Sequence, residues 1–213
     1  FEVMDDVSKG GDIFIQNAQM RLEIDASTGL LKSITSADNL QVIPLEIKFG
    51  GYKTLLKRSG AYLFESDGPE RAIFENDAAS HIVIVKGPIA SYITVVYGSL
   101  LFHTVRLLKT QTHLDNAIFI VNHLSIEQRH SNVEMFMRIK TSIDNGQEFF
   151  TDLNGFQWMR RQRTSKLKVE GNYYPITNSI FIQDKNLRAT LVTNHAQGAT
   201  SANSGEFEVM LDK

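Results

Sequence analysis

The 213-residue chain contains no cysteine. A disulfide-held fold and a thiolate metal site are therefore both excluded. No apolar run approaches the ~18 residues that span a bilayer, and no N-x-S/T sequon marks a glycosylation site. Lysine and arginine total 22 against 24 acidic residues, which gives a net charge of -2. We therefore expect no nucleic-acid partner and no direct membrane contact from this segment.

Most of the chain has the alternating pattern of half-buried strands. Residues 21–25 alternate polar and apolar, residues 27–29 read as a turn, and residues 30–34 return as the second strand of a hairpin. No segment has a helical period. Further strands are predicted at residues 81–85, 91–97, 101–108, 117–122, 133–139, 179–183, 189–193 and 206–211.

Strands at this spacing, separated by turn residues, predict an all-β fold, specifically a large antiparallel β-sandwich. The chain begins at Phe1 with no signal-like segment and ends at Lys213 inside a strand pattern. We therefore expect residues 1–213 to be part of one domain of a longer protein, with the sandwich incomplete.

Two stretches interrupt the strand pattern. Residues 53–71 are charged and punctuated by glycine, and residues 149–175 carry five basic residues between aromatic ones. Both are predicted to be long loops, where function is often located on a rigid β-scaffold.

The six histidines show no metal-ligand spacing, so we interpret them as structural or surface residues. The basic run at residues 159–163 follows Trp158, a combination that single-stranded nucleic-acid sites use. The run is short and the chain is net acidic. The favoured interpretation is a solvated loop that pairs with acidic residues elsewhere in a parent protein.

The stretch FFTDLNGFQ, residues 149–157, allows a sugar loop, a catalytic carboxylate or a tight turn. Glu148 and Asp152 are a candidate carboxylate pair, because retaining glycosidases use two carboxyl groups ~5 Å apart. The residue types favour a turn instead. Asp152 can accept backbone N–H bonds, Asn154 and Gly155 suit positive φ, and the flanking phenylalanines are expected to anchor the loop.

Tyr62, in the stretch SGAYLF, is the candidate for ligand binding. Gly60 permits close approach of the backbone, and the Tyr62 phenol can stack on a sugar or donate to its hydroxyls. An ordinary strand entrance with Tyr62 in the core explains the same residues equally well.

Five blocks together resemble the class II α-mannosidases of glycoside hydrolase family 38. In chain order they are TGLLKSI (28–34), KRSGAYLF (57–64), FFTDLNGFQ (149–157), GNYYPITNSIFIQD (171–184) and SGEFEVMLD (204–212). The third block is closer to the Golgi mannosidase II branch and the fourth to the lysosomal branch.

The resemblance implies a segment of the C-terminal half of a much longer enzyme, including a galactose-mutarotase-like sandwich. The α/β catalytic domain and the helical bundle that precede it in the family are not in this chain. Family members hydrolyse α-mannosidic bonds with retention, using two carboxyl groups and a zinc ion. The chain therefore carries no catalytic residue and no metal ligand, and zinc is a cofactor of the parent enzyme only.

The resemblance assigns substrate binding to Tyr62, which in the family contacts the bound mannose. It implies that the parent enzyme trims mannose from N-glycans in the secretory pathway, in the Golgi lumen or alternatively the lysosome. The expected partners are a mannose-containing glycan and the rest of the parent polypeptide. The segment is expected to form structural support and one wall of the cleft, inactive alone. The alternatives are a free-standing carbohydrate-binding sandwich and a mutarotase-like epimerase, for which no His/Glu pair is apparent.

Overall fold

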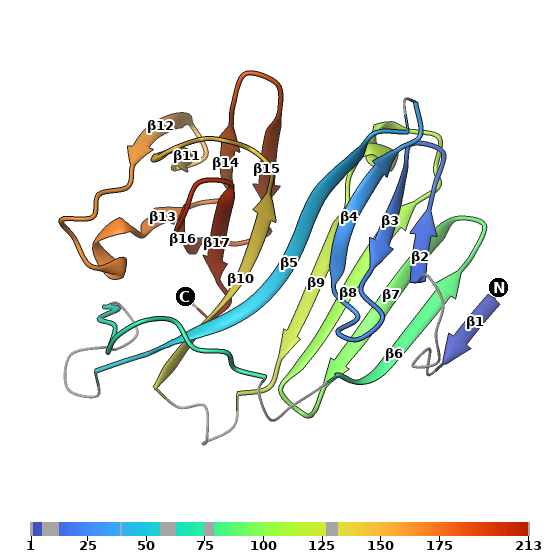
Figure 1. Ribbon diagram of the computed structural model, residues 1–213, viewed down its shortest axis with the longest axis horizontal. Coiled ribbons are helices and arrows are strands. Elements are labelled where there is room, and N and C mark those ends of the chain that lie inside the picture. Colours follow the sequence, from blue (N-terminus) through green and yellow to red (C-terminus); the bar gives the residue numbers. More distant parts are fainter. Residues whose placement is uncertain are drawn as a thin grey trace. The chain divides into compact units, whose positions relative to one another are not determined.

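The computed structural model describes residues 2–5, 13–38, 40–55, 63–74, 79–126 and 132–212, and in them the fold is all-β. Every strand pairing given by the register is antiparallel. The described helical segments are two single 3₁₀ turns, η1 (His113–Asn116) and η3 (Val169–Asn172), neither long enough to cross a membrane. The predicted antiparallel β fold is confirmed (Figure 1).

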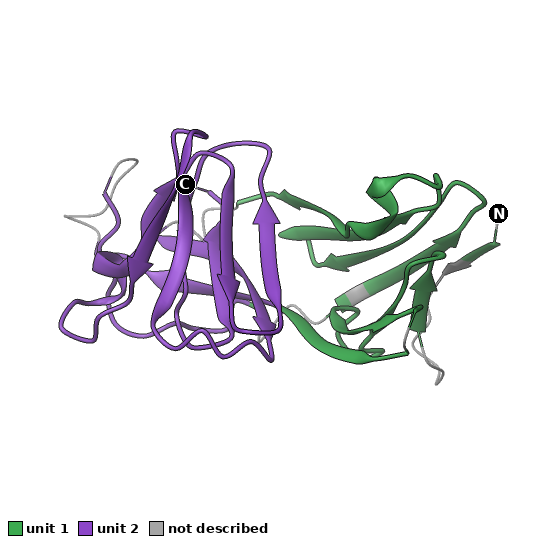
Figure 2. Ribbon diagram, turned by 90° about the horizontal axis from the view of Figure 1, so that it is seen from above, with its two compact units in different colours: residues 1–47, 74–129 green, residues 48–73, 130–213 purple. Residues whose placement is uncertain are grey.

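The chain divides into two compact units, coloured separately in Figure 2. Unit 1 comprises residues 1–47 and 74–129, and unit 2 comprises residues 48–73 and 130–213. Strand β5 (Val42–Lys53) contributes its first part to unit 1 and its second part to unit 2. The prediction that residues 1–213 belong to one domain of a longer protein stays a prediction.

Unit 1 is a sandwich of two antiparallel sheets. The first sheet has the order β1-β6-β7-β8-β9, and in the second the first part of β5 is followed by β4, β3 and β2. The strands are β1 (Glu2–Asp5), β2 (Ile13–Gln16), β3 (Met20–Ile24), β4 (Leu31–Ser36), β6 (Ala79–Lys86), β7 (Ala90–Tyr97), β8 (Leu101–Leu108) and β9 (Phe119–Leu124).

The core of unit 1 is formed by the alternate side chains of its strands that point into the sandwich. Along β7 every second side chain is buried, including Ile93 and Val95, and these face the second sheet. Gly29 closes the β3–β4 turn at φ +71, and a Cβ there would lie 2.6 Å from Val95 Cγ2. The turn therefore requires glycine, both for its conformation and for the approach of the opposite sheet.

Unit 2 also contains two antiparallel sheets. One has the order β12-β11-β14-β15, and in the other β13, β16, β17 and β10 lead to the second part of β5. The strands are β10 (Val133–Thr141), β11 (Glu148–Leu153), β12 (Gln157–Gln162), β13 (Tyr174–Ile176), β14 (Ser179–Gln183), β15 (Arg188–Val192), β16 (Gln197–Thr200) and β17 (Glu206–Met210). Phe149, Ile180 and Phe207 are among the side chains buried in its core.

All ten predicted strands are present, displaced by at most two residues at either end. The predicted loop at residues 149–175 is wrong, because it contains most of β11, all of β12, the η3 turn and the start of β13. The basic side chains of β12 mark an exposed strand of a hairpin. The predicted connection at residues 53–71 is confirmed in its described part, where residues 63–71 form only isolated bridges to β5 and Thr54.

His103 on β8 is a buried titratable group in unit 1. Its side chain is 0% exposed, and Nδ1 lies 2.7 Å from Asn122 Oδ1. Burial lowers the pKa of the His103 imidazole from 6.5 to about 4, although the contact with Asn122 opposes the shift. The imidazole is therefore neutral in the folded state at neutral pH.

We predict that His103 makes unit 1 less stable as the pH falls from 6.5 toward 4. Between these two pH values the imidazole binds a proton in the unfolded chain but not in the folded chain. This difference lowers the free energy of unfolding by ~3 kcal/mol as the pH falls to 4. His103→Gln cannot titrate and should flatten the dependence. Hydrogen exchange of peptides from β8 and β9, corrected for intrinsic rates, measures it at pH 7 and 4.5. An equally steep loss of protection in wild type and variant would contradict the prediction.

Candidate functional site

Tyr62, the predicted substrate-binding residue, lies outside the described residues. The residues that follow it are described, and they are fixed to the second part of β5. The Leu55 amide donates to the Glu65 carbonyl at 3.1 Å, and the Asp67 amide donates to the Lys53 carbonyl at 2.7 Å. Ser66 pairs with Thr54 in a β-bridge. The chain directly after Tyr62 is thus held by backbone hydrogen bonds.

Aromatic side chains hold Phe64, the second residue after Tyr62. The Phe64 ring lies 5.7 Å from the ring of Tyr52 on β5 and 5.6 Å, edge to face, from Tyr173. Tyr52 in turn packs against Phe136 on β10 at 5.0 Å. Such offset and edge contacts are the favoured geometries of aromatic pairs, so the cluster stabilises one position of Phe64.

Below this cluster lies a fully buried carboxylate, Glu208 on β17, which is 0% exposed. Its Oε1 accepts hydrogen bonds from the hydroxyls of Tyr52, at 2.8 Å, and of Tyr173. Its Oε2 accepts from Arg138 Nε at 2.6 Å. A buried charge is tolerated only when it is paired and hydrogen-bonded, and this one meets both conditions.

Arg138 on β10 connects the buried carboxylate to the surface. Its guanidinium also donates to both carboxylate oxygens of Glu70, through Nη1 at 3.0 Å and through Nη2. It lies over the Phe136 ring, 4.7 Å from the centroid. The fork geometry of arginine allows it to bind two carboxylates at once, which lysine cannot reproduce.

The electrostatics of this cluster follow from its burial. Burial raises the pKa of the Glu208 carboxyl, and the Arg138 charge opposes part of that shift. Burial and the neighbouring Glu208 charge raise the pKa of both tyrosines well above 10, so both hydroxyls remain donors. Burial lowers the pKa of Arg138, but bonding to Glu70 and Glu208 outweighs it and the net shift is upward.

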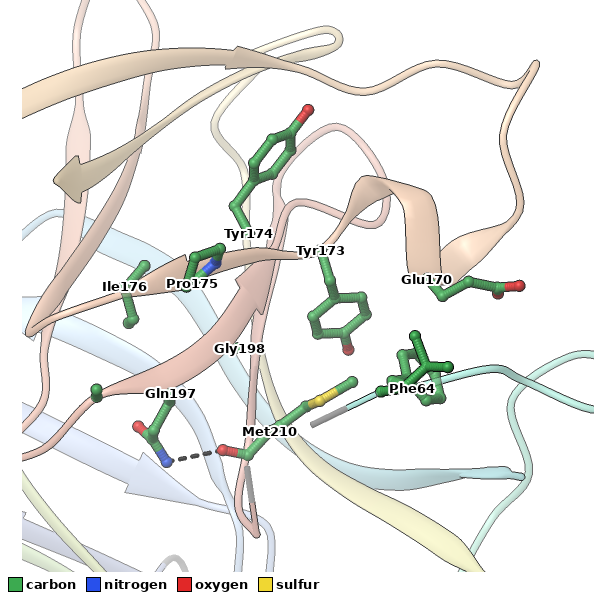
Figure 3. A pocket seen from close by; sticks show the side chains of 11 residues that line it. Phe64, Glu170, Tyr173, Tyr174, Pro175, Ile176, Gln197, Gly198 and Met210 are labelled. Carbon is green, nitrogen blue, oxygen red and sulfur yellow. Dashed lines mark hydrogen bonds between the residues drawn. The ribbon is translucent and has the colours of Figure 1, made fainter. Parts of the chain in front are cut away.

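A groove of about 420 Å³ lies beside this cluster. In Figure 3 the side chains of Phe64, Tyr173 and Met210 gather around one space, while the Glu170 carboxylate points away from it. Two polar side chains of the groove make hydrogen bonds within the chain, because the Gln197 amide donates to the Met210 carbonyl at 2.7 Å and Glu170 accepts from Ser66 at 2.8 Å. The residues that line it are Leu63, Phe64, Glu170, Tyr173, Tyr174, Pro175, Ile176, Ala196, Gln197, Gly198 and Met210.

The cluster around Glu208 has a structural role and does not have the arrangement of a glycosidase active site. A retaining glycosidase needs two carboxyl groups that face the scissile bond from opposite sides. Glu208 has no access to solvent and Glu70 shares the same guanidinium, so neither has that arrangement. The arrangement fixes the position of the segment that follows Tyr62.

Asp152, in the stretch FFTDLNGFQ, organises a turn as predicted. Its Oδ2 accepts the Gly155 amide at 2.8 Å, and its Oδ1 accepts three successive amides of residues 177–179 at 2.9–3.1 Å. Asn154 and Gly155 have φ of 55° and 65°. Burial raises the pKa of Asp152, but these backbone bonds outweigh it and hold the pKa below its usual 3.8. The carboxylate therefore stabilises the fold above that pH and loses the effect below it.

One detail of that prediction is wrong. Phe149 is fully buried and Phe150 stacks on Phe181 at 4.5 Å, so both anchor the hairpin as expected. Phe156 does not, because its side chain is 90% exposed at the hairpin tip. The positive-φ turn projects that residue away from the sheet.

Three arginines of the basic segment, residues 159–163, make hydrogen bonds or ion pairs within the chain. Arg160 pairs with Glu148, Arg161 donates to Thr151 Oγ1 at 3.0 Å, and Arg163 donates to the Ala202 carbonyl. Glu148 is thus an ion-pair partner on the hairpin.

No role was predicted for Glu208, Arg138, Tyr52 or Tyr173, although Glu208 and Tyr173 lie in the family blocks. The available signal was a charged residue inside an otherwise apolar strand. It occurs in MFMRIK around Arg138 and in FEVM around Glu208. Two opposite charges in two buried strands indicate a buried ion pair.

Comparison with known proteins shows the family to which the chain belongs. Residues 15–213 match the model of the glycosyl hydrolases family 38 C-terminal domain. The chain belongs to glycosyl hydrolase family 38, and the resemblance carried by the five sequence blocks is confirmed.

The relatives include the Spodoptera frugiperda protein named Alpha-mannosidase 2, 39% identical over 95% of this chain and 19% of that protein. Human Alpha-mannosidase 2 is 31% identical over 100% of this chain and 18% of its own length. Bovine Lysosomal alpha-mannosidase is 28% identical over 95% of this chain and 21% of its own length. The chain therefore spans about a fifth of the length of these relatives.

A solved structure shares the fold. The alpha-mannosidase from Enterococcus faecalis V583 superposes with a TM-score of 0.71 at 12% identity, over 99% of this chain and 26% of that chain. The backbone arrangement persists at an identity that retains few side chains.

We predict that the two tyrosines bound to Glu208 act non-additively. Tyr52→Phe or Tyr173→Phe leaves Oε1 one donor and should cost ~1.5–3 kcal/mol of unfolding free energy. The double variant leaves Oε1 none, so its cost should exceed the sum of the two. Urea unfolding monitored by hydrogen exchange in β17 gives the three values. Tyr92→Phe on β7 is the control, and additivity within ~0.5 kcal/mol would refute the shared-acceptor account.

We predict that Asp152→Ala destabilises unit 2 by ~3 kcal/mol or more, because four amides lose their acceptor. Asp152→Asn keeps one carbonyl oxygen and should lose about half as much. Hydrogen exchange of the amides of residues 177–179 reports the loss directly. Asp184→Ala is a matched control, since Asp184 accepts turn amides at a more exposed site. Equal protection of residues 177–179 in wild type and Asp152→Ala would contradict this role.

Proposed function

We propose that this chain is part of a retaining, zinc-dependent α-mannosidase that removes mannose from N-glycans. The family match over residues 15–213 carries the proposal, together with relatives named as α-mannosidases. The chain supplies structural support and one wall of the substrate cleft, and the catalytic carboxyl groups lie elsewhere in the polypeptide.

The zinc ion of this proposal has its ligands outside the chain. Among the described residues, no group of three or more His, Cys, Asp or Glu side chains is placed to hold a metal ion. The donor set present here does not fit a zinc site, so no step of the reaction is assigned through these residues.

Tyr62 is the residue through which this chain contacts mannose. The observation that supports this role is the anchoring of the chain directly after it, by backbone bonds at Glu65 and Asp67 and by the aromatic contacts of Phe64. A substrate contact is most effective when its backbone is already fixed before the substrate binds.

The proposed compartment is the secretory pathway, in the Golgi lumen, with the lysosome as the alternative. Identity is higher to the Spodoptera frugiperda Alpha-mannosidase 2 than to the bovine lysosomal enzyme, 39% against 28%.

Tyr62→Phe in the full-length enzyme tests the proposal. Loss of one hydrogen bond to the sugar, worth ~1–2 kcal/mol, should lower kcat/KM for p-nitrophenyl α-mannoside about tenfold. Tyr92→Phe, on β7 of unit 1, is the matched control and should leave kcat/KM unchanged. Wild-type kinetics in Tyr62→Phe would remove Tyr62 from the site. A wild-type enzyme that does not cleave the mannoside would instead reject the proposed activity.

A further inference from the structure

The chain contains two Asn-Gly sequences, at residues 145–146 and 154–155, and their surroundings differ. An asparagine followed by glycine is chemically labile, because glycine has no Cβ to keep its backbone nitrogen away from the neighbouring side-chain amide. The reaction requires the glycine nitrogen to approach the asparagine Cγ in an attacking geometry. The contacts around each sequence therefore decide whether it reacts in the folded protein.

Asn145 is buried and hydrogen-bonded through both atoms of its amide group. Its side chain is 8% exposed, and its Oδ1 accepts the Gly205 amide at 2.7 Å. Its Nδ2 donates to the Glu148 carbonyl at 2.5 Å. The Gly146 amide donates to Ser204 Oγ at 3.0 Å. Rotation of the Asn145 side chain toward the Gly146 nitrogen would break these buried hydrogen bonds, so the folded state protects this sequence.

Asn154 lies at the exposed tip of the β11–β12 hairpin, directly after Leu153, whose pairing with Gln157 is the last of the two strands. Asn154 and Gly155 are both exposed to solvent. A Cβ built on Gly155 would lie 3.9 Å from Asn178 Nδ2, the nearest non-adjacent atom among the described residues. Packing therefore leaves room at the tip for the side chain of Asn154 to rotate.

Two hydrogen bonds hold the backbone of this tip. The Gly155 amide donates to Asp152 Oδ2 at 2.8 Å, and the Phe156 amide donates to the Leu153 carbonyl at 3.0 Å. Asn154 and Gly155 have φ of 55° and 65° within the turn that these bonds close. Attack by the Gly155 nitrogen requires it to lose its proton and turn toward Cγ. The hydrogen bond to the Asp152 carboxylate opposes both changes.

We propose that Asn154 is a site of spontaneous deamidation and that the Asp152 carboxylate limits its rate. The Gly155 nitrogen forms a bond to Asn154 Cγ as its proton passes to solvent, and the Cγ–Nδ2 bond breaks with release of ammonia. Water then opens the resulting succinimide at either carbonyl, which gives aspartate or isoaspartate at this position. The proposal does not depend on mannosidase activity.

The isoaspartate product changes the hairpin itself. Its main chain runs through the side-chain Cβ and Cγ and is one atom longer between residues 154 and 155. The Gly155 amide then no longer meets Asp152 in this turn, while the amides of residues 177–179 keep their acceptor. Deamidation therefore releases the hairpin tip and leaves the other turn bound to Asp152.

Peptide mass spectrometry of the full-length protein, incubated in mildly alkaline buffer, tests the site. In urea, where neither turn persists, both asparagines should convert at comparable rates. In the folded protein Asn145 should convert at least ~tenfold more slowly than Asn154. Equal conversion of the two asparagines in the folded protein would overturn the proposal. So would an unchanged Asn154 in the folded protein after the sample in urea has reacted.

Asp152→Ala tests the role of the carboxylate. It should accelerate conversion of Asn154 several-fold, because the Gly155 amide loses its acceptor, and leave Asn145 at its wild-type rate. Asn145 lies in the same unit and so reports any general loss of structure. Asp25→Ala, which removes the acceptor of turn amides in unit 1, is the control and should change neither rate. Equal acceleration of both asparagines in Asp152→Ala, or none, would show that Asp152 does not control the reaction.

Discussion

The buried carboxylate of Glu208 is the constraint on which the packing of Tyr52, Arg138 and Tyr173 in unit 2 depends. A charge without access to water costs several kcal/mol unless donors surround it. Here the donors come from three different segments, because Tyr52 is on β5, Arg138 is on β10 and Tyr173 follows η3. None of these segments can move independently without leaving a buried charge partly unpaired. The ion pair thus fixes the three segments relative to one another and adds little to the net free energy of unfolding.

A second buried and hydrogen-bonded carboxylate, Asp152, lies at the β11–β12 hairpin of unit 2. Asp152 is also nearly inaccessible, and its oxygens accept four backbone amides from two separate turns. Glu208 accepts hydrogen bonds from side chains, and Asp152 accepts them from backbone amides. Both carboxylates stabilise the fold through these bonds. A general acid or nucleophile needs a free oxygen directed at the substrate. Neither Glu208 nor Asp152 has such an oxygen, because the hydrogen bonds described above engage both oxygens of each carboxylate.

The sequence predicted the strands well and the buried charges poorly, for physical reasons. The period of two is local, so the strand at residues 101–108 could be located from its own residues. Strand β5 was not predicted, and it contains Gly50 and Gly51, a residue type that is depleted in strands. A Cβ on Gly50 would lie 2.4 Å from the Phe136 ring, so glycine makes room for an aromatic neighbour. The contact between Tyr52 and Glu208 joins residues 156 positions apart, and a pattern within one segment cannot indicate it.

The described residues on either side of Tyr62 are held by hydrogen bonds and aromatic contacts. On one side Thr54 donates its amide to the Asn132 carbonyl at 2.9 Å, and on the other Phe64 is enclosed by Tyr52 and Tyr173. The Leu55 amide and the Glu65 carbonyl then join the two ends at 3.1 Å. A connection whose ends are joined in this way has already lost most of its closure entropy on folding. Under the proposed role of Tyr62, substrate binding does not have to supply that entropy cost again.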